Sequence, residues 1–145
     1  MTVTKSFEGA LGRIFVVRLP TDGDLLKSIE DFAEKVGVEA GVLWVVGAVR
    51  KAVVKYYNQK EKKYSKISLD FPLEILSCIG NISKFKGKIM AHVHLVLGDK
   101  EGKTFGGHLD EGTTIFSAEM FLLEVKNIVL EREYDEVTGL NLFKI

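Results

Sequence analysis

Apolar and polar positions follow two different periods along this chain. From Leu25 to Val36, apolar residues recur every three or four positions, which places them on one face of a helix. The segment Thr21–Gly23 offers N-cap candidates before this pattern, and Gly37 is a natural stop after it. The spacing therefore predicts one main helix in the first quarter of the chain.

Most of the remaining chain has the pattern of β-strands. β-Branched and aromatic residues fill these stretches, and short segments rich in Gly, Pro, Asp or Lys separate them. The predicted strands cover residues 12–19, 41–58, 64–69, 73–82, 89–97, 103–109, 113–116, 118–128 and 140–145. Gly47 lies inside the longest of them, where a glycine indicates a bulge or a close backbone approach. We expect an α+β fold: a mixed, largely antiparallel β-sheet sandwich with one main helix.

Length and composition favour one globular unit. The chain has 145 residues, of which 46% are apolar and 28% charged, and this is enough to bury a real core. We expect a single domain over residues 1–145, with its core from about residue 12 to the end. Lysine and arginine together number 20, as do aspartate and glutamate. This balance argues against a surface devoted entirely to nucleic acid.

Targeting and redox signals indicate a cytoplasmic protein. No apolar run approaches the roughly 20 residues that a membrane span needs, so we expect no membrane partner. The first five residues lack the charged-then-apolar pattern of a signal peptide. Cys78 is the single cysteine, which excludes an internal disulfide and is best interpreted as core packing.

All three histidines lie in two short segments, at His92, His94 and His108. Residues i and i+2 of a strand point to the same face, so His92 and His94 are neighbours. If 89–97 and 103–109 pair as a hairpin around the 98–102 turn, His108 joins them. Three neutral imidazoles with an open position are the arrangement of catalytic zinc. We expect a divalent metal here, with zinc as the first candidate. The main competing interpretation is a shared pocket without metal.

Four acidic residues are further candidates. Glu74 and Glu119 lie in apolar strands, where each is either a general acid or base or, as we favour, a solvent-facing residue. Asp110 and Glu111 follow His108 closely. They either orient a ligand imidazole or, as we favour because it is more common for loop acids, are merely solvated. None of these positions fixes a reaction.

Several segments, taken in order, resemble the plant-and-prokaryote-conserved (PPC, also called PCC) domain of AT-hook nuclear-localized proteins. The matching segments are Val46–Val49 with Tyr56–Tyr57, Leu73–Ser77, His92–Leu95, Asp99–Lys103, Phe105–Gly112 and Ser117–Glu119. The resemblance covers roughly residue 12 to the end. It implies a homotrimer whose plant members serve self-association and contact with other factors. The PPC fold is also similar to that of α-acetolactate decarboxylase, whose zinc is held by three histidines. This supports His92, His94 and His108 as the metal ligands without transferring the reaction.

Three hypotheses of function follow. The first is a homotrimeric cytoplasmic PPC protein whose three-histidine pocket binds a divalent metal. It would bind a small molecule or assist chemistry on a small carbonyl or carboxylate compound, and whether it is an enzyme stays open. The second is a DNA-associated or regulatory protein-interaction module without catalysis. The lysine clusters at 60–66 and 84–88 support it, although the chain has no Arg-Gly-Arg-Pro hook. A trimer that only scaffolds protein partners is a third interpretation.

Overall fold

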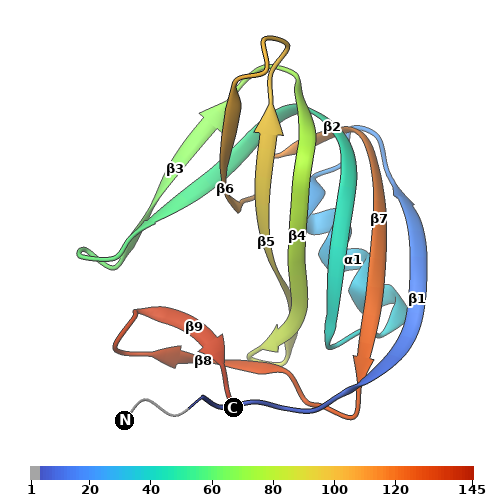
Figure 1. Ribbon diagram of the computed structural model, residues 1–145, viewed down its shortest axis with the longest axis vertical. Coiled ribbons are helices and arrows are strands. Elements are labelled where there is room, and N and C mark those ends of the chain that lie inside the picture. Colours follow the sequence, from blue (N-terminus) through green and yellow to red (C-terminus); the bar gives the residue numbers. More distant parts are fainter. Residues whose placement is uncertain (1–3) are drawn as a thin grey trace.

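The computed structural model describes residues 4–145, and within them it contains one helix and nine strands (Figure 1). The helix is α1 (Leu25–Val36). The strands are β1 (Ala10–Leu19), β2 (Gly41–Asn58), β3 (Lys63–Leu69), β4 (Leu73–Phe85), β5 (Lys88–Gly98), β6 (Thr104–Leu109), β7 (Thr114–Lys126), β8 (Glu131–Asp135) and β9 (Leu140–Phe143). All strands join one mixed, mostly antiparallel sheet, so the predicted α+β class is confirmed.

The sheet closes partly on itself because β2 bends. Its order is β1-β7-β2-β6-β5-β4-β8-β9, with β3 paired to β2 and a further pairing between β2 and β4. The first half of β2 pairs with β7 and β4, whereas its second half pairs with β3 and β6. Strands β2, β4, β5 and β6 therefore form a closed circuit, and β2–β3 projects from it as an arm (Figure 1).

Gly47 lies in the irregular part of β2, where the register against β7 shifts between Ala48 and Lys51. Its φ of 142° is one that side chains rarely adopt, and an added Cβ would clash with the carbonyl oxygen of Ser117. The register against β4 also shifts between Trp44 and Gly47. The expected bulge and close backbone approach are thus both found.

The helix begins one residue later than the predicted caps. Asp24, not a residue of Thr21–Gly23, is the N-cap, and its carboxylate accepts the amide of Lys27 at 3.0 Å. Asp22 is instead in a turn with a φ of 64°, and its side chain pairs with Arg50. The predicted stop is confirmed, because Gly37 has a φ of 68° and its amide donates to the last turn.

Three strand predictions need correction. β4 continues to Phe85 because Lys84 and Phe85 pair in parallel with Glu131 and Arg132 of β8, a strand that the pattern did not predict. β7 is one strand and not two, since Ser117 pairs with Ala48 of β2. The remaining predicted strands agree with the structure within about two residues at each end.

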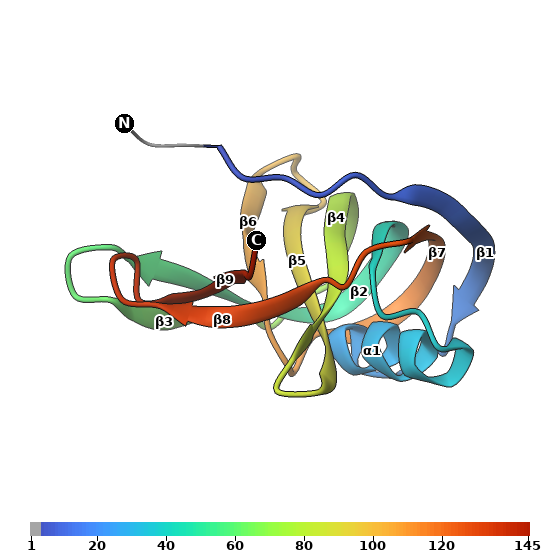
Figure 2. The ribbon, with the colours of Figure 1, turned by 90° about the horizontal axis from the view of Figure 1, so that it is seen from below.

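One face of the sheet and the buried side of α1 form the core. Leu25, Ile29 and Ala33 of the helix are fully buried against it, and Figure 2 shows α1 along one side of the sheet. Within residues 4–145, no helix is long and apolar enough to cross a membrane. Residues 1–3, which belong to the predicted domain and to the segment inspected for a signal peptide, lie outside the described residues.

Candidate metal centre

The β5–β6 hairpin brings the three histidines together. His94 lies directly opposite His108 in the ladder, and His92 lies two residues before His94 on the same face. The ring centroid of His92 lies 5.0 Å from the centroid of His94 and 5.0 Å from that of His108. The centroids of His94 and His108 are 5.5 Å apart. One nitrogen from each ring lies within 4.8 Å of the other two. The expected convergence is therefore found.

The Gly106–Gly107 pair allows this arrangement. A Cβ on Gly106 would lie 2.7 Å from the carbonyl oxygen of Leu95, and one on Gly107 would lie 2.9 Å from that of Lys55. Both distances are shorter than real side chains tolerate. Without side chains at these positions, β6 fits between β5 and the second half of β2 and places His108 beside its partners.

Burial keeps two of the imidazoles neutral. It lowers the pKa of His92 to about 4, with help from the positive charge of Arg132 and from His94. It likewise lowers the pKa of His108 to about 4, with help from His92 and Lys55. Near pH 7 both rings consequently have a lone pair to offer. Neutral imidazoles are the form that binds metal.

The donor set fits a divalent metal such as zinc. The Nε2 atoms of His92 and His94 lie 3.2 Å apart. Two nitrogens bound to tetrahedral zinc at their usual bond length of about 2.0–2.1 Å are about 3.3 Å apart. Three imidazole nitrogen donors leave the fourth position open. The residues present are thus suitable ligands for such an ion.

Arg132 of β8 lies next to this cluster and was not predicted. Its guanidinium donates to Ser83 Oγ, the Asn141 carbonyl oxygen and Asn81 Oδ1, each at 2.8 Å. One of its nitrogens also lies 3.5 Å from Nδ1 of His92. The residue is only 7% exposed.

The acidic residues after His108 have other partners than the imidazoles. Asp110 is buried and forms ion pairs with Lys55 at 2.9 Å and Lys66 at 2.7 Å. Glu111 pairs with Lys27 at 3.2 Å. The interpretation in which these acids orient a ligand histidine is therefore wrong. The favoured one, solvated loop acids, holds for the exposed Glu111 but not for the buried Asp110. Asp110 instead balances two lysines beside the site.

A cavity of about 520 Å³ opens on the three histidines. It lies between the β2–β3 arm and the β8–β9 hairpin, which are tied together by hydrogen bonds of 2.7 Å from Tyr57 Oη to Thr138 and from Lys62 Nζ to Glu136. Its lining combines the histidines with cations, amides, aromatic rings and aliphatic side chains: Lys55, Tyr56, Tyr57, Gln59, Tyr64, Met90, His92, His94, His108, Arg132, Leu140, Asn141 and Leu142. The volume is suitable for a small molecule.

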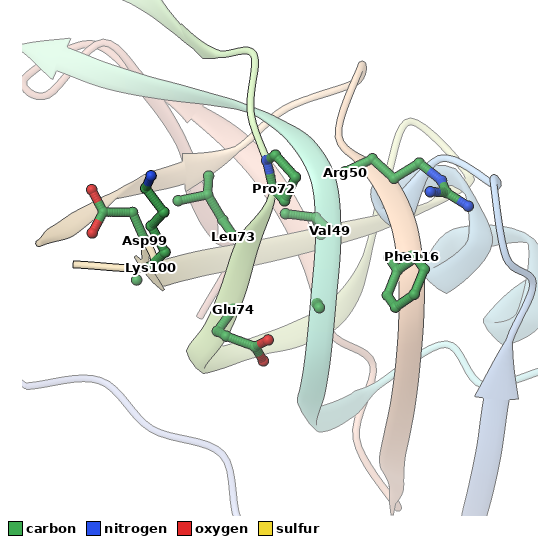
Figure 3. A pocket seen from close by; sticks show the side chains of 10 residues that line it. Val49, Arg50, Pro72, Leu73, Glu74, Asp99, Lys100 and Phe116 are labelled. Carbon is green, nitrogen blue, oxygen red and sulfur yellow. The ribbon is translucent and has the colours of Figure 1, made fainter. Parts of the chain in front are cut away.

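Another cavity, of about 400 Å³, lies at a different part of the sheet (Figure 3). Its polar side chains point in different directions (Figure 3), and two of them have partners outside the cavity. Arg50 pairs with Asp22, and the carboxylate of Asp99 accepts amides of its own turn. Because few polar groups converge here, this cavity lacks the features of a catalytic or metal site.

The remaining candidates have structural or solvent-facing positions. Glu74 and Glu119 are exposed, as the favoured interpretation expected. Cys78 is buried, and burial raises the pKa of its thiol to about 12. It is therefore a core residue and not a nucleophile.

Sequence reasoning missed Arg132, Tyr64 and Asn81 as neighbours of the histidines. The ring of Tyr64 lies 5.4 Å from that of His108, and Asn81 is opposite His92 in the β4–β5 ladder. The β4–β5 pairing was predictable from the hairpin pattern and would have found Asn81. No local signal marks Arg132, which arrives from a strand that pairs in parallel.

Two solved structures are similar to almost the whole chain. A metal-containing protein from Archaeoglobus fulgidus is 42% identical, with a TM-score of 0.92, and the match covers 97% of this chain and 99% of that one. A plant- and prokaryote-conserved (PPC) protein from Pyrococcus horikoshii is 34% identical, with a TM-score of 0.92 and 98% of each chain covered. A proposed DNA-binding protein from Bacteroides thetaiotaomicron is 22% identical, covers 94% of this chain and 96% of its own, and has a TM-score of 0.84. This last likeness shows the fold alone.

The chain is also similar in sequence to curated proteins and to a family model. The bifunctional protein GlmU of a Synechococcus strain is 33% identical over 129 residues, which are 88% of this chain but 20% of that protein. The chain thus spans about a fifth of the length of the curated relatives it matches. The model of the Plants and Prokaryotes Conserved (PCC) domain matches residues 6–126. This chain therefore belongs to the Plants and Prokaryotes Conserved domain family.

Proposed function

We propose that this protein binds a divalent metal ion, with zinc as the expected one, through His92, His94 and His108. The observation that carries the proposal is the convergence of one nitrogen from each ring within 4.8 Å. The neutral state of His92 and His108 supports it, as does the metal-containing relative that is 42% identical. A bound zinc ion would polarise an oxygen atom of a ligand or acidify a bound water. The physiological role that fits is metal-assisted binding of a small molecule in the adjoining cavity.

We further propose that three copies of the chain assemble. Val16, Phe121, Trp44 and Ile79 are cross-strand neighbours in one row on the sheet, all are substantially exposed, and the row ends at His94. A contiguous apolar surface of this kind is typical of an interface between proteins. A cavity of about 430 Å³ lined by Trp44, Ile79 and two of the histidines joins the row to the candidate site. The interface would therefore adjoin the metal.

Metal analysis of the purified chain tests the first proposal. We expect about one zinc ion per chain after incubation with zinc and removal of the excess. His92→Ala and His108→Ala should lose most of the bound metal because each removes one of three donors. Gln59→Ala, which changes the same cavity without removing a nitrogen ligand, is the matched control. A folded wild-type protein that holds no stoichiometric metal would contradict the proposal.

Association with DNA is a second candidate function, supported by exposed lysines of the β2–β3 turn. Some lysines of these clusters already have partners, since Lys66 pairs with Asp110 and Lys84 with Glu39. Binding driven by phosphate contacts should weaken steeply as salt rises. No binding to duplex DNA at low salt would eliminate this function for the isolated chain.

A further inference from the structure

Arg132 is a buried cation without an acidic partner. It is 7% exposed, and every group that its guanidinium contacts is uncharged: Ser83, Asn81, the Asn141 carbonyl, His92 and the ring of Phe143, whose centroid lies 4.3 Å from the guanidinium carbon. Among residues 4–145, no carboxylate lies within ion-pair distance of it. Buried charges in proteins are normally paired. An anion from outside the described residues would therefore balance the buried charge of Arg132.

The cavity beside Arg132 carries a net positive charge. Arg132, Lys55 and the three histidines line it, and none of its lining residues among those described is acidic. Asp110, just outside, balances Lys55. The charge of Arg132 is left over, and a bound divalent metal would add two more positive charges. An anionic group that enters this cavity would be attracted both by Arg132 and by the bound metal ion.

The guanidinium of Arg132 also has one hydrogen-bond donor without an acceptor within residues 4–145. A guanidinium has five N–H groups, and one of the two hydrogens on the terminal nitrogen bonded to Asn141 has no acceptor among the described residues. The other contacts fix the plane of the group: Nε donates to Ser83 Oγ, and the second terminal nitrogen donates to Asn81 Oδ1. A guanidinium held in this way is pre-organised to bind an oxyanion.

The rest of the cavity is largely apolar. Tyr57 and Tyr64 contribute rings from the β2–β3 arm, and Met90, Leu140 and Leu142 contribute aliphatic surface. A volume of about 520 Å³ accommodates a small organic molecule. Such walls favour a ligand with an apolar body over a bare inorganic ion.

We propose that this cavity binds a small carboxylate with an apolar body, its negative end lying between the three-histidine site and Arg132. The inference rests on the proposed metal site and deepens it by naming the ligand class and Arg132 as the residue that positions the anion. The carboxylate would accept hydrogen bonds from the guanidinium. Its body would lie between the arm and the β8–β9 hairpin.

Titration calorimetry on the zinc-loaded full chain tests this inference, with benzoate as the carboxylate and benzamide as its neutral counterpart. We expect benzoate to bind at least about 10-fold more tightly than benzamide, because only benzoate supplies the missing charge. Arg132→Gln should weaken benzoate binding by at least about 10-fold while the zinc content stays unchanged. Lys63→Gln removes an exposed lysine of the same arm that does not line the cavity, and should leave binding as it is.

Other outcomes separate the two proposals. If zinc binds stoichiometrically but benzoate and benzamide bind equally or not at all, the ligand inference fails and the metal proposal stands. If the chain takes up no zinc, the metal proposal fails, and benzoate titrated into the metal-free chain tests whether Arg132 alone selects an anion. Tighter binding of inorganic phosphate than of benzoate would overturn the carboxylate assignment. Should Arg132→Gln fail to fold, the wild-type comparison of benzoate with benzamide still decides the question.

Discussion

At the scale of single residues, the site depends on imidazoles that stay neutral. Although the Asp110 carboxylate weakly opposes the shift at His108, both His92 and His108 are partly buried and the cations Arg132 and Lys55 lie close to them. Both effects disfavour the protonated ring, so the pKa of each falls to about 4. The same surroundings that exclude protons leave the nitrogen lone pairs available for a metal ion.

This shift predicts acid sensitivity of the metal-free protein. In the unfolded chain the two histidines take up protons below their ordinary pKa near 6.5, whereas in the folded chain they do so only near pH 4. The unfolded state therefore binds more protons between these values, and stability is present above about pH 6.5 and falls as the pH drops toward 4. From pH 7 to pH 5 we expect a loss of about 1–3 kcal/mol in the free energy of unfolding, discounted for partial exposure.

Urea unfolding at several pH values measures this loss. In the double variant His92→Asn/His108→Asn the slope between pH 7 and 5 should become shallower, because the two titrating rings are gone. An equally steep slope in the variant would assign the acid sensitivity to other groups.

Cys78 gives a second prediction at this scale. Its thiol is buried and its pKa is raised to about 12, so almost none of it is thiolate at pH 8. A thiol reagent such as Ellman's reagent should react with the native protein at least about 100-fold more slowly than with the urea-unfolded chain. Comparable rates in the two states would contradict the buried, protonated assignment.

At the scale of elements, the bend of β2 is what makes the site possible. Gly47 lets the strand turn at a φ of 142° while its backbone lies against Ser117 of β7. The second half of β2 then pairs with β6 at His108. One glycine in the middle of a strand thus links the large sheet to the histidine hairpin.

Two glycine substitutions test this role. Gly47→Ala should cost about 3 kcal/mol or more in the free energy of unfolding, because it combines an unfavourable φ with a backbone clash. Gly37→Ala is the matched control, since its φ of 68° is also positive but nothing lies within 4 Å of the added Cβ. It should cost only about 1–2 kcal/mol. Equal losses in thermal or urea unfolding would show that the bend does not depend on the close approach at Gly47.

Local sequence patterns predicted some of these elements and missed others. Spacing and turn residues were sufficient for α1, for the β5–β6 hairpin and hence for the meeting of His92, His94 and His108, because these depend on local periodicity. β8 was missed, and with it Arg132. Its pairing with β4 is parallel and joins residues far apart in sequence, which no local pattern records. The ion pairs of Asp110 were not predicted, because the lysines that it pairs with come from β2 and β3.

At the scale of the whole molecule, the sheet face opposite the core is unusually apolar. Trp44 is 46% exposed and Val16 73% exposed, in a row that continues to the histidines. All described strands belong to one sheet, so we propose that residues 1–145 form one folding unit. Thermal unfolding should accordingly show one cooperative transition in which circular dichroism and tryptophan fluorescence coincide. Two separate transitions would contradict a single unit.

Assembly is the second prediction at this scale. Light scattering should give a mass of three times the 16.2 kDa of one chain. Trp44→Glu places a charge in the middle of the apolar row and should shift the mass toward that of one chain. Val137→Glu, at an exposed apolar position outside the row, is the control that should leave the mass unchanged. A Trp44→Glu protein with the wild-type mass would locate the interface elsewhere.

The central claim is that three histidines hold one metal ion, and a crystal structure of the zinc-loaded protein tests it most directly. Diffraction data collected on both sides of the zinc absorption edge should show one anomalous peak per chain. The peak should lie about 2.0–2.1 Å from one nitrogen each of His92, His94 and His108. An ordered set of three imidazoles with no anomalous peak between them, in protein supplied with zinc, would contradict the claim.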